Sequence, residues 1–309
     1  MTVNAAIEFI RRHFKSGQPF FAVVWFGSPH NPHIALDADR QLYNDQSEQF
    51  QHFYGEITAM DRAFGKLRSE LKTLGIKDNT LLWYCSDNGG LPNLGSTGGR
   101  GFKGQIYDGG LRVPAIIEWP ERITAPRVTD VPCNTTDIYL TLLQIAGITY
   151  IPGQTPVDGI SLVNLIDGKI TSRSKPMGFW DYPIAGISTP SHQWMMELLE
   201  AQKDGDPTGD TARLRLNAGD ITKQYPEDDF PGHAAWLDWP WKLHRIQGEN
   251  GDVTLELYNL SVDAGENNNL VNSESDRVAN MRPALEKWLT CVVQSLNGKD
   301  YEDTWLIPE

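Results

Sequence analysis

The chain has 309 residues, a formal net charge of −13, ten tryptophans and a hydrophobic content of 40%. A chain of this length and composition can bury enough core for one large domain and a smaller one, which excludes a disordered protein. The acidic balance argues against nucleic acid as the main partner, because phosphate binding needs a basic face, but a local cation could still hold an anionic substrate.

Targeting and cross-linking signals are weak along the whole chain. No apolar run is long enough to span a membrane. The residues after Met1 form an amphipathic stretch, so we expect no signal peptide there. Cys85, Cys133 and Cys291 lie far apart, without the spacing of a metal site or a disulfide framework.

The first elements predict a helix and then a strand. Residues 3–14 place Ala6, Ile7, Ile10 and Phe14 on one side of a short helix, with Asn4 as an N-cap candidate. The apolar run from Phe20 to Phe26 predicts a buried strand. It ends in the proline-bounded loop Gly27-Ser28-Pro29-His30-Asn31-Pro32-His33. An isolated His-x-x-His is usually incidental, but the position at a strand's end makes His30 and His33 candidate site residues.

Residues 46–74 carry the clearest helical periodicity, and Gly75 marks the stop. The continuous apolar run from Thr80 to Tyr84 then predicts a strand buried on both faces. The strand–helix–strand order predicts a mostly parallel central sheet flanked by helices, an α/β fold with a right-handed crossover.

Polar residues with ligand chemistry follow the Thr80–Tyr84 strand. Asp87 and Asn88 supply a carboxylate and an amide oxygen side by side, which suits calcium or magnesium better than zinc. Lys103 follows among Gly98, Gly99, Gly101 and Gly104, where the backbone can approach an anion closely and the ammonium supplies a point charge. Taken singly, each motif is more often an ordinary turn or a solvated lysine. Their pairing in one strand–loop–strand unit favours a site.

The later chain predicts further elements and three segments. Val113–Trp119 reads as a strand, residues 136–146 as a helix stopped by Gly147, and Ser161–Ile166 as a short helix. We expect residues 1–171 to form the α/β domain and residues 172–238 to form an insertion of loops with a helical patch near Trp194–Gln202. Residues 239–309 form a small antiparallel sheet, from two strands at Trp241–Ile246 and Thr254–Leu260, backed by a terminal helix at Ser275–Val293.

Three motifs in order, Ser-Asp-Asn-Gly at 86–89, Gly-Phe-Lys-Gly at 101–104 and Tyr-Asp-Gly-Gly-Leu-Arg-Val-Pro at 107–114, follow Ser-Pro-His-Asn-Pro-His at 28–33. This arrangement resembles the later part of a type I (formylglycine-dependent) sulfatase of the alkaline-phosphatase-like superfamily. The resemblance runs from about Gln18 to Gly159 and resumes weakly from about Trp239 to Trp288. The small C-terminal antiparallel sheet with a helix also matches that family.

The resemblance implies a sulfuric ester hydrolase that acts on a sulfated carbohydrate or an aryl sulfate through a metal-bound sulfate. Asp87 and Asn88 would bind calcium, with magnesium as the alternative, and Lys103 would bind a sulfate oxygen and the leaving group. His30 would protonate the leaving oxygen or donate to the sulfate, and His33 would contact the substrate. Full-length relatives are often periplasmic or secreted, so we expect that compartment.

The family's nucleophile, a formylglycine made from Cys or Ser in a Cys/Ser-x-Pro-x-Arg motif, has no counterpart in the chain. The nearest string is Ser188-Thr189-Pro190-Ser191-His192, which ends in His and follows the central motif instead of preceding it. The family's first-strand acidic pair is absent too. We therefore expect a shortened sulfatase whose N-terminal nucleophile segment is missing, and which binds metal weakly and does not turn over.

Two other functions stay open. Phosphodiesterases and phosphonate hydrolases of the same fold usually carry Asp-His where this chain has Asp87-Asn88, so the amide oxygen favours sulfate and a harder metal. A non-catalytic sugar-binding or scaffold protein could have kept the fold and lost the nucleophile.

Overall fold

The computed structural model describes residues 2–149, 151, 154–182, 200 and 224–301. The described chain separates into two compact units. The first unit comprises Met1–Thr97 and Val113–Val128, and the second comprises Gly98–Arg112 and Thr129–Glu309.

The first unit contains the elements α1 (Thr2–Ser16), α2 (Asp37–Arg40), η1 (Gln41–Tyr43), α3 (Glu48–Thr73), β1 (Leu82–Cys85) and β2 (Ala115–Glu118). The second contains α4 (Asp108–Leu111), α5 (Thr136–Ile145), α6 (Val163–Ile166), β3 (Met177–Asp181), β4 (Gly232–Asp238), β5 (Trp241–Gln247), β6 (Val253–Asn259), α8 (Ser275–Leu296) and η4 (Lys299–Tyr301).

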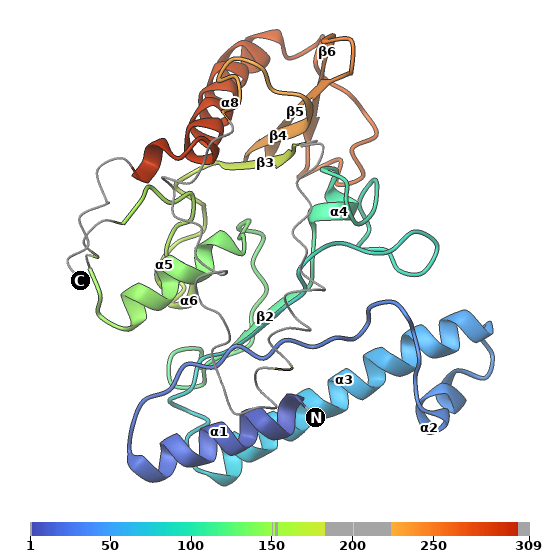
Figure 1. Ribbon diagram of the computed structural model, residues 1–309, viewed down its shortest axis with the longest axis vertical. Coiled ribbons are helices and arrows are strands. Elements are labelled where there is room, and N and C mark those ends of the chain that lie inside the picture. The colour runs from blue at the N-terminus through green and yellow to red at the C-terminus, as the bar shows by residue number, and fades with distance from the viewer. Residues whose placement is uncertain (1, 150, 152–153, 183–199, 201–223, 302–309) are drawn as a thin grey trace. The chain divides into compact units, whose positions relative to one another are not determined.

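Two helices, α1 and α3, lie side by side in the first unit (Figure 1). Their contact is an apolar cluster that buries Val3, Ile7, Ile10, Leu67 and Leu71. The periodicity of residues 46–74 therefore predicted a helix correctly, and Gly75 follows its end with a φ of +71°. The prediction of Asn4 as the N-cap is wrong, because α1 already includes Thr2. The Asn4 amide oxygen instead accepts a hydrogen bond from Lys66 Nζ at 2.7 Å.

The apolar run Phe20–Phe26 is extended but does not form a strand. Phe20, Val24 and Phe26 pack against the α1–α3 cluster. The alternate residues face outward, with Phe21 64%, Val23 62% and Trp25 84% exposed. Within the described chain, residues 20–26 have no backbone hydrogen bond. The expected buried strand is therefore not formed in the described structure, where only one face of the run is covered.

The strands β1 and β2 pair antiparallel, with Leu82 opposite Glu118 and Cys85 opposite Ala115. The β1 residues are half-buried, and Ile116 in β2 is 65% exposed. The sequence predicted a strand at each place correctly, but it overestimated their burial. A continuous apolar run is typical of a strand between two covered faces, and here one covering layer is lacking in the described structure. The mostly parallel central sheet is not confirmed by this pair.

Residues 30–40 are fixed to helix α3 by polar contacts. The Ile34 N–H donates to Glu56 Oε1 at 2.8 Å, and the Ala35 N–H donates to His52 Nδ1 at 3.1 Å. The buried Asp39 accepts a hydrogen bond from Arg62 at 2.5 Å. The long helix therefore carries the histidine loop, because three of its polar side chains hold the segment that follows His30 and His33.

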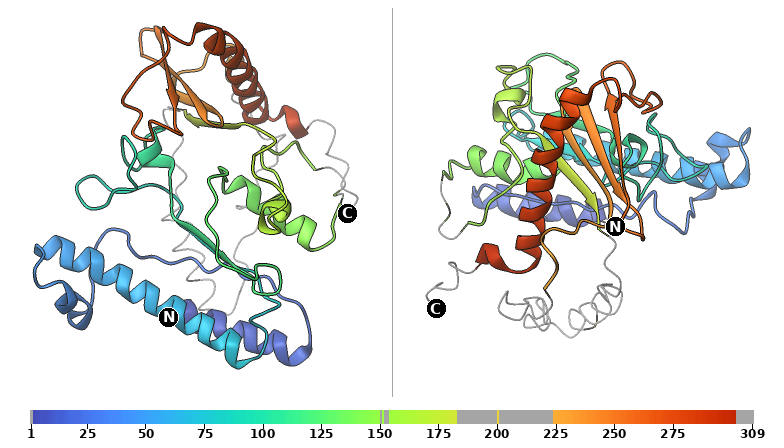
Figure 2. Two further views of the ribbon diagram at one scale, coloured as in Figure 1. Left: turned by 180° about the vertical axis from the view of Figure 1, so that it is seen from behind. Right: turned by 90° about the horizontal axis from the view of Figure 1, so that it is seen from above.

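The second unit is built on a four-stranded antiparallel sheet in the order β3-β4-β5-β6. Helix α8 covers one of its faces, as Figures 1 and 2 show. That face is apolar: Ala234 packs with Leu285 and Leu289 of the helix, and Leu243 packs with Met281. The strands at 241–246 and 254–260 and the helix at 275–293 were predicted correctly.

Half of the sheet lies where the sequence indicated loops. Strands β3 and β4 fall within residues 172–238, so the prediction of an insertion of loops is wrong at Met177–Asp181 and Gly232–Asp238. Both are short, and each is stabilised by pairing: β3 with β4, and β4 with β5. The helical patch expected near Trp194–Gln202 lies outside the described residues, apart from Glu200. The segment boundaries at 171 and 239 stay predictions.

A buried ion pair connects helix α5 to the chain that follows α6. Asp137 accepts two hydrogen bonds from the Arg173 guanidinium, at 2.7 and 2.9 Å, and the two side chains are 0% and 3% exposed. The Asp137 carboxylate also accepts the N–H groups of Asn134 and Ile160. Both helices lie where the sequence predicted them. None of the helices in the described part of the chain has the length and apolar character needed to cross a bilayer.

We predict that Asp137→Asn strongly destabilises the protein, because it leaves the buried Arg173 cation without a counter-charge. The expected loss in the free energy of unfolding is about 3–5 kcal/mol, measured by urea unfolding. The control is Arg282→Ala, which removes a half-exposed pair with Glu286 and should cost less than about 1 kcal/mol. Equal losses in the two variants would contradict this assignment.

We also predict that Glu56→Ala loosens the histidine loop, because the Ile34 N–H loses its partner. The expected effect is a loss of about 1–3 kcal/mol and faster amide exchange in residues 31–36. Glu48→Ala, on the same helix but with a side chain 81% exposed, is the matched control. Unchanged exchange at Ile34 in Glu56→Ala would show that other contacts hold the loop.

Candidate functional site

The two loop histidines differ in environment. His30 is exposed, and its Nδ1 lies 3.0 Å from the carbonyl oxygen of Asn31. A carbonyl can only accept, so Nδ1 carries a hydrogen and Nε2 is left as the ring nitrogen that can exchange a proton with a ligand. His33 is half-buried with its ring edge-on to Phe53 at 5.3 Å, and its buried Nε2 has no hydrogen-bond partner among the described residues.

Asp87 and Asn88 follow strand β1 in a bend. Asp87 is exposed and Asn88 is half-buried. The Ser86 N–H donates to the Pro114 carbonyl at 3.3 Å, and the Ser86 hydroxyl donates to the Asn88 carbonyl at 3.1 Å. The β1–β2 pairing therefore continues for one more residue and sets where the two side chains begin. As predicted, a carboxylate and an amide stand at the end of a strand.

These two residues fit a hard divalent cation in kind but not in number. Carboxylate and amide oxygens suit calcium or magnesium, but calcium takes about six to eight oxygen ligands. Among the described residues, no group of three or more His, Cys, Asp and Glu is arranged to hold a metal. Asp87 and Asn88 could therefore supply only part of a coordination shell.

Lys103 belongs to the second unit, whereas His30, His33, Asp87 and Asn88 belong to the first. The lysine is half-buried near the tip of a loop that closes where the Gly109 N–H donates to the Arg100 carbonyl at 2.7 Å. A Cβ on Gly109 would lie 2.3 Å from the Gly101 carbonyl oxygen, and one on Gly110 would lie 2.1 Å from that of Gln105. The glycine pair is thus required for the loop to close.

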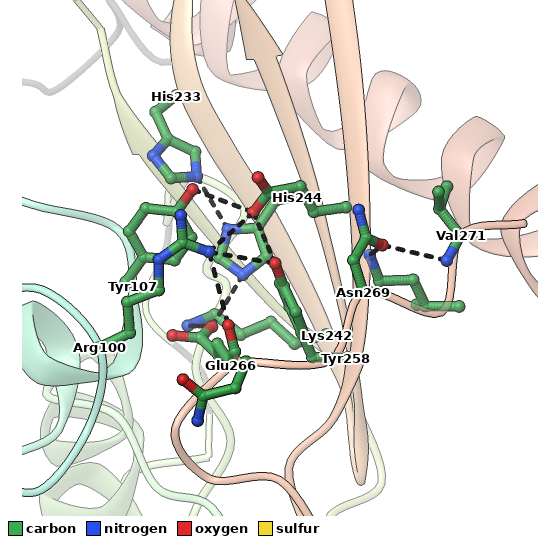
Figure 3. A network of polar contacts seen from close by, with 12 residues as sticks. Arg100, Tyr107, His233, Lys242, His244, Tyr258, Glu266, Asn269 and Val271 are labelled. Atoms are coloured by element: carbon green, nitrogen blue, oxygen red, sulfur yellow. Dashed lines mark hydrogen bonds and ion pairs between the residues drawn. The ribbon is translucent and has the colours of Figure 1, made fainter.

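This loop meets the face of the sheet opposite to helix α8, where polar side chains gather (Figure 3). The centre of the network is Glu266, just after β6 and only 1% exposed. Its Oε1 forms an ion pair with Lys242 Nζ at 2.9 Å and accepts a hydrogen bond from His244 Nε2 at 2.8 Å. Its Oε2 accepts from the Asp108 N–H at 2.7 Å. Lys242 and His244 are themselves fully buried.

The network fixes the charge states of its members. Burial by itself would raise the pKa of Glu266, but the hydrogen bond from His244 and the charge of Lys242 outweigh it and lower the pKa to about 2. Burial, together with the neighbouring His244 and Lys242, lowers the pKa of His233 to about 3. Burial also lowers the pKa of His244. Since Glu266 only accepts, neutral His244 donates from Nε2, and its Nδ1 accepts from His233 Nε2 at 2.8 Å.

None of the network residues was singled out from the sequence. A signal was present: Lys242 and His244 alternate with the apolar Trp241 and Leu243, which places two titratable side chains on one face of a strand. Their carboxylate partner, Glu266, lies in a loop 22 residues after His244. No spacing rule connects such a pair.

We predict that the free energy of unfolding falls as the pH drops from about 6.5, the ordinary pKa of histidine, towards about 3. In this pH range the unfolded chain binds protons at His233 and His244, whereas the two histidines of the folded protein stay neutral. His233→Gln removes one of these groups, so the free energy of unfolding should depend less steeply on pH, by at most one proton equivalent. Urea unfolding between about pH 7.5 and about pH 4.5 measures this. His30→Gln, at an exposed histidine, is the control; equal slopes in both variants would contradict the prediction.

Residues 2–148 match the family model described as Sulfatase. The chain is 31% identical over 178 residues to the N-acetylgalactosamine-6-sulfatase of Canis lupus familiaris, covering 55% of the chain and 33% of that protein. It is also 31% identical over 183 residues to an ulvan-active sulfatase of Formosa agariphila, covering 53% of the chain and 35% of that protein. The chain thus spans about a third of the length of these curated relatives.

Solved structures resemble the fold over nearly the whole chain. The structure of Ps i-CgsB in complex with k-i-k-neocarrahexaose aligns with a TM-score of 0.71 at 21% identity, covering 98% of this chain and 59% of that one. The PsFucS1 sulfatase from Pseudoalteromonas sp. aligns with a TM-score of 0.63 at 22% identity, covering 98% and 53%. These likenesses concern the fold alone. Residues 2–148 of this chain are thus similar to the sulfatase family in sequence, and the described chain shares the fold of solved sulfatase structures.

Proposed function

We propose that this protein hydrolyses sulfate esters. The observation that carries the proposal is the match of residues 2–148 to the sulfatase family, within which His30, Asp87, Asn88 and Lys103 stand in the order that the resemblance requires. Because the chain spans only 33% of the relative with N-acetylgalactosamine-6-sulfatase activity in its name, the activity of the whole protein is inferred rather than established.

The proposed role of each site residue follows from the chemistry of its side chain. The Lys103 ammonium binds a non-bridging sulfate oxygen and the leaving oxygen, where negative charge develops in the transition state. His30, with Nδ1 bonded to the Asn31 carbonyl, presents Nε2 to protonate the leaving alcohol. His33 contributes a substrate contact, a role that rests on the resemblance alone.

Two further groups complete the reaction. Asp87 and Asn88 would contribute oxygen ligands to calcium, with magnesium as the alternative, and a divalent cation at that position supplies charge neutralisation on the sulfate oxygens. The formylglycine nucleophile needs a Cys/Ser-x-Pro-x-Arg sequence, which the 309 residues do not contain. We therefore expect these residues by themselves to bind the ester without cleaving it.

The proposed substrate is a sulfated carbohydrate or an aryl sulfate. Support for carbohydrates comes from relatives named as acting on N-acetylgalactosamine 6-sulfate and ulvan, and from a neighbour of TM-score 0.50 in complex with a glucosamine disulfate. Support for aryl sulfates comes from a relative named arylsulfatase H. A periplasmic or secreted location is proposed from the resemblance alone.

The proposal also includes a mostly parallel central sheet. We propose that the extended segment Phe20–Phe26 is a strand of a mostly parallel central sheet in the whole protein. Its alternating burial and the unpaired backbone of residues 20–26 in the described chain support this, since both are what a strand lacking its neighbours would show.

The test uses the complete polypeptide that contains this chain, produced in a host that makes formylglycine and assayed with calcium on a chromogenic aryl sulfate and on sulfated sugars. Hydrolysis is expected, and Lys103→Ala and His30→Ala should each lower kcat by about 10²- to 10⁴-fold, the usual contribution of one charge-stabilising or proton-transferring group. The 309 residues alone should give no turnover.

Two variants serve as matched controls. His13→Ala removes another histidine of the first unit, and Lys169→Ala removes a lysine of the second unit whose side chain is 66% exposed. Both should keep full activity. Preferred hydrolysis of a phosphodiester or phosphonate would favour the hydrolases of the same fold. No hydrolysis of any ester would favour a non-catalytic sugar-binding or scaffold protein.

A further inference from the structure

The loop that carries Lys103 is anchored on both sides of the lysine by one carboxylate. On the C-terminal side, the Tyr107 hydroxyl donates to Glu256 Oε2 at 2.9 Å. On the N-terminal side, Arg100 Nη1 lies 3.4 Å from the same oxygen and donates to the Tyr258 hydroxyl at 3.1 Å. Tyr258 in turn donates to Glu256 Oε2 at 2.9 Å. Three donors therefore converge on one atom of strand β6.

The two anchors also contact each other. The Arg100 guanidinium lies over the Tyr107 ring, 3.9 Å from its centroid (Figure 3). Burial and the Glu256 charge raise the pKa of Tyr107 and raise that of Tyr258 to about 12, so both hydroxyls keep the protons that they donate. The Glu256 side chain is only 17% exposed, which protects these charge-assisted hydrogen bonds from solvent screening.

The anchoring has a consequence for the lysine between the two contacts. Lysine is a point charge on a flexible four-carbon stem, so the position of its ammonium depends on how well its backbone is fixed. Within the loop, the Gln105 N–H donates to the Phe102 carbonyl at 3.0 Å, and the Phe102 N–H donates to Gln105 Oε1 at 3.2 Å. These bonds hold the tip only if both ends of the loop stay in place.

We propose that Glu256 is a positioning residue, which holds residues 100–109 through Tyr107 and Arg100 and so presents Lys103 to an oxygen of a tetrahedral oxyanion such as sulfate. This inference rests on the proposed function for the role of Lys103. It assigns to the antiparallel sheet of the second unit a part in anion binding, because Glu256 lies in β6 and touches no ligand itself. Preorganising a cation in this way lowers the ordering cost when the anion arrives.

The test compares Tyr107→Phe and Glu256→Gln with the unaltered chain. Tyr107→Phe removes one hydroxyl and opens no cavity, so it keeps the experiment decisive if Glu256→Gln folds poorly. Tyr139→Phe is the matched control, since it deletes an exposed hydroxyl bonded to Gln154 in the same unit. Three quantities are measured: amide hydrogen exchange in residues 100–109, the thermal midpoint, and the Kd for inorganic sulfate from amide NMR shifts of residues 102–104, with chloride at equal ionic strength as the reference.

We expect both variants to speed exchange in residues 100–109 by about tenfold and to weaken sulfate binding by about three- to tenfold, the size expected for one lost charge-assisted hydrogen bond. The thermal midpoint of Tyr107→Phe should match that of Tyr139→Phe, because a purely structural role would lower stability instead of affinity. Unchanged exchange, or faster exchange with unchanged sulfate affinity, overturns the inference. Lys103→Ala separates the two claims: sulfate binding that survives this variant removes the proposed role of Lys103 itself.

Discussion

The second unit depends on one buried carboxylate that must find donors. Glu266 can only accept hydrogen bonds, and at 1% exposure it has no access to water. Its partners come from separate segments: the Asp108 N–H from the lysine loop, and Lys242 and His244 from β5. The backbone of Glu266 has a φ of +53°, a left-handed conformation that non-glycine residues rarely adopt. The contacts of its carboxylate compensate for this strain. Glu266 therefore joins the Lys103 loop to the antiparallel sheet, and we expect substitutions of this residue to be poorly tolerated.

The parts of the fold that the sequence predicted are those whose pattern is local. Helix α3 is identified by its own periodicity, and the β5–β6 hairpin by two alternating runs around a turn. Strand β3 was missed because a five-residue strand gains its stability from a cross-strand partner, and its partner β4 lies about 50 residues later in the chain. Strand β4 was missed although its partner β5 follows after two residues, because the surrounding Pro, Gly and Asp residues indicated a loop. The run Phe20–Phe26 shows the opposite error, since apolar composition reports that burial is favourable, not that a covering layer is present.

The candidate site likewise contains residues that local sequence patterns indicated and residues that only the fold reveals. The sequence proposed His30, Asp87, Asn88 and Lys103 as candidates because each lies in a short motif with glycine or proline neighbours and a distinctive chemistry. The residues that support the motifs were not found. Glu56 and Glu256 are ordinary glutamates in a helix and a strand, and only the fold brings them to the Ile34 N–H and the Tyr107 hydroxyl. Motifs therefore indicate candidate ligand-binding groups, whereas the groups that orient them depend on tertiary structure.

The exposed row of Phe21, Val23 and Trp25 has a practical consequence for anyone handling this polypeptide. An extended segment with a bare apolar face and unpaired backbone groups is a template on which a second chain can add as a strand. Preparations of these residues alone will tend to self-associate as the concentration rises. Lysine or glutamate at position 23 or 25 would act as a gatekeeper charge and improve solubility without disturbing Phe20, Val24 and Phe26, which pack inward.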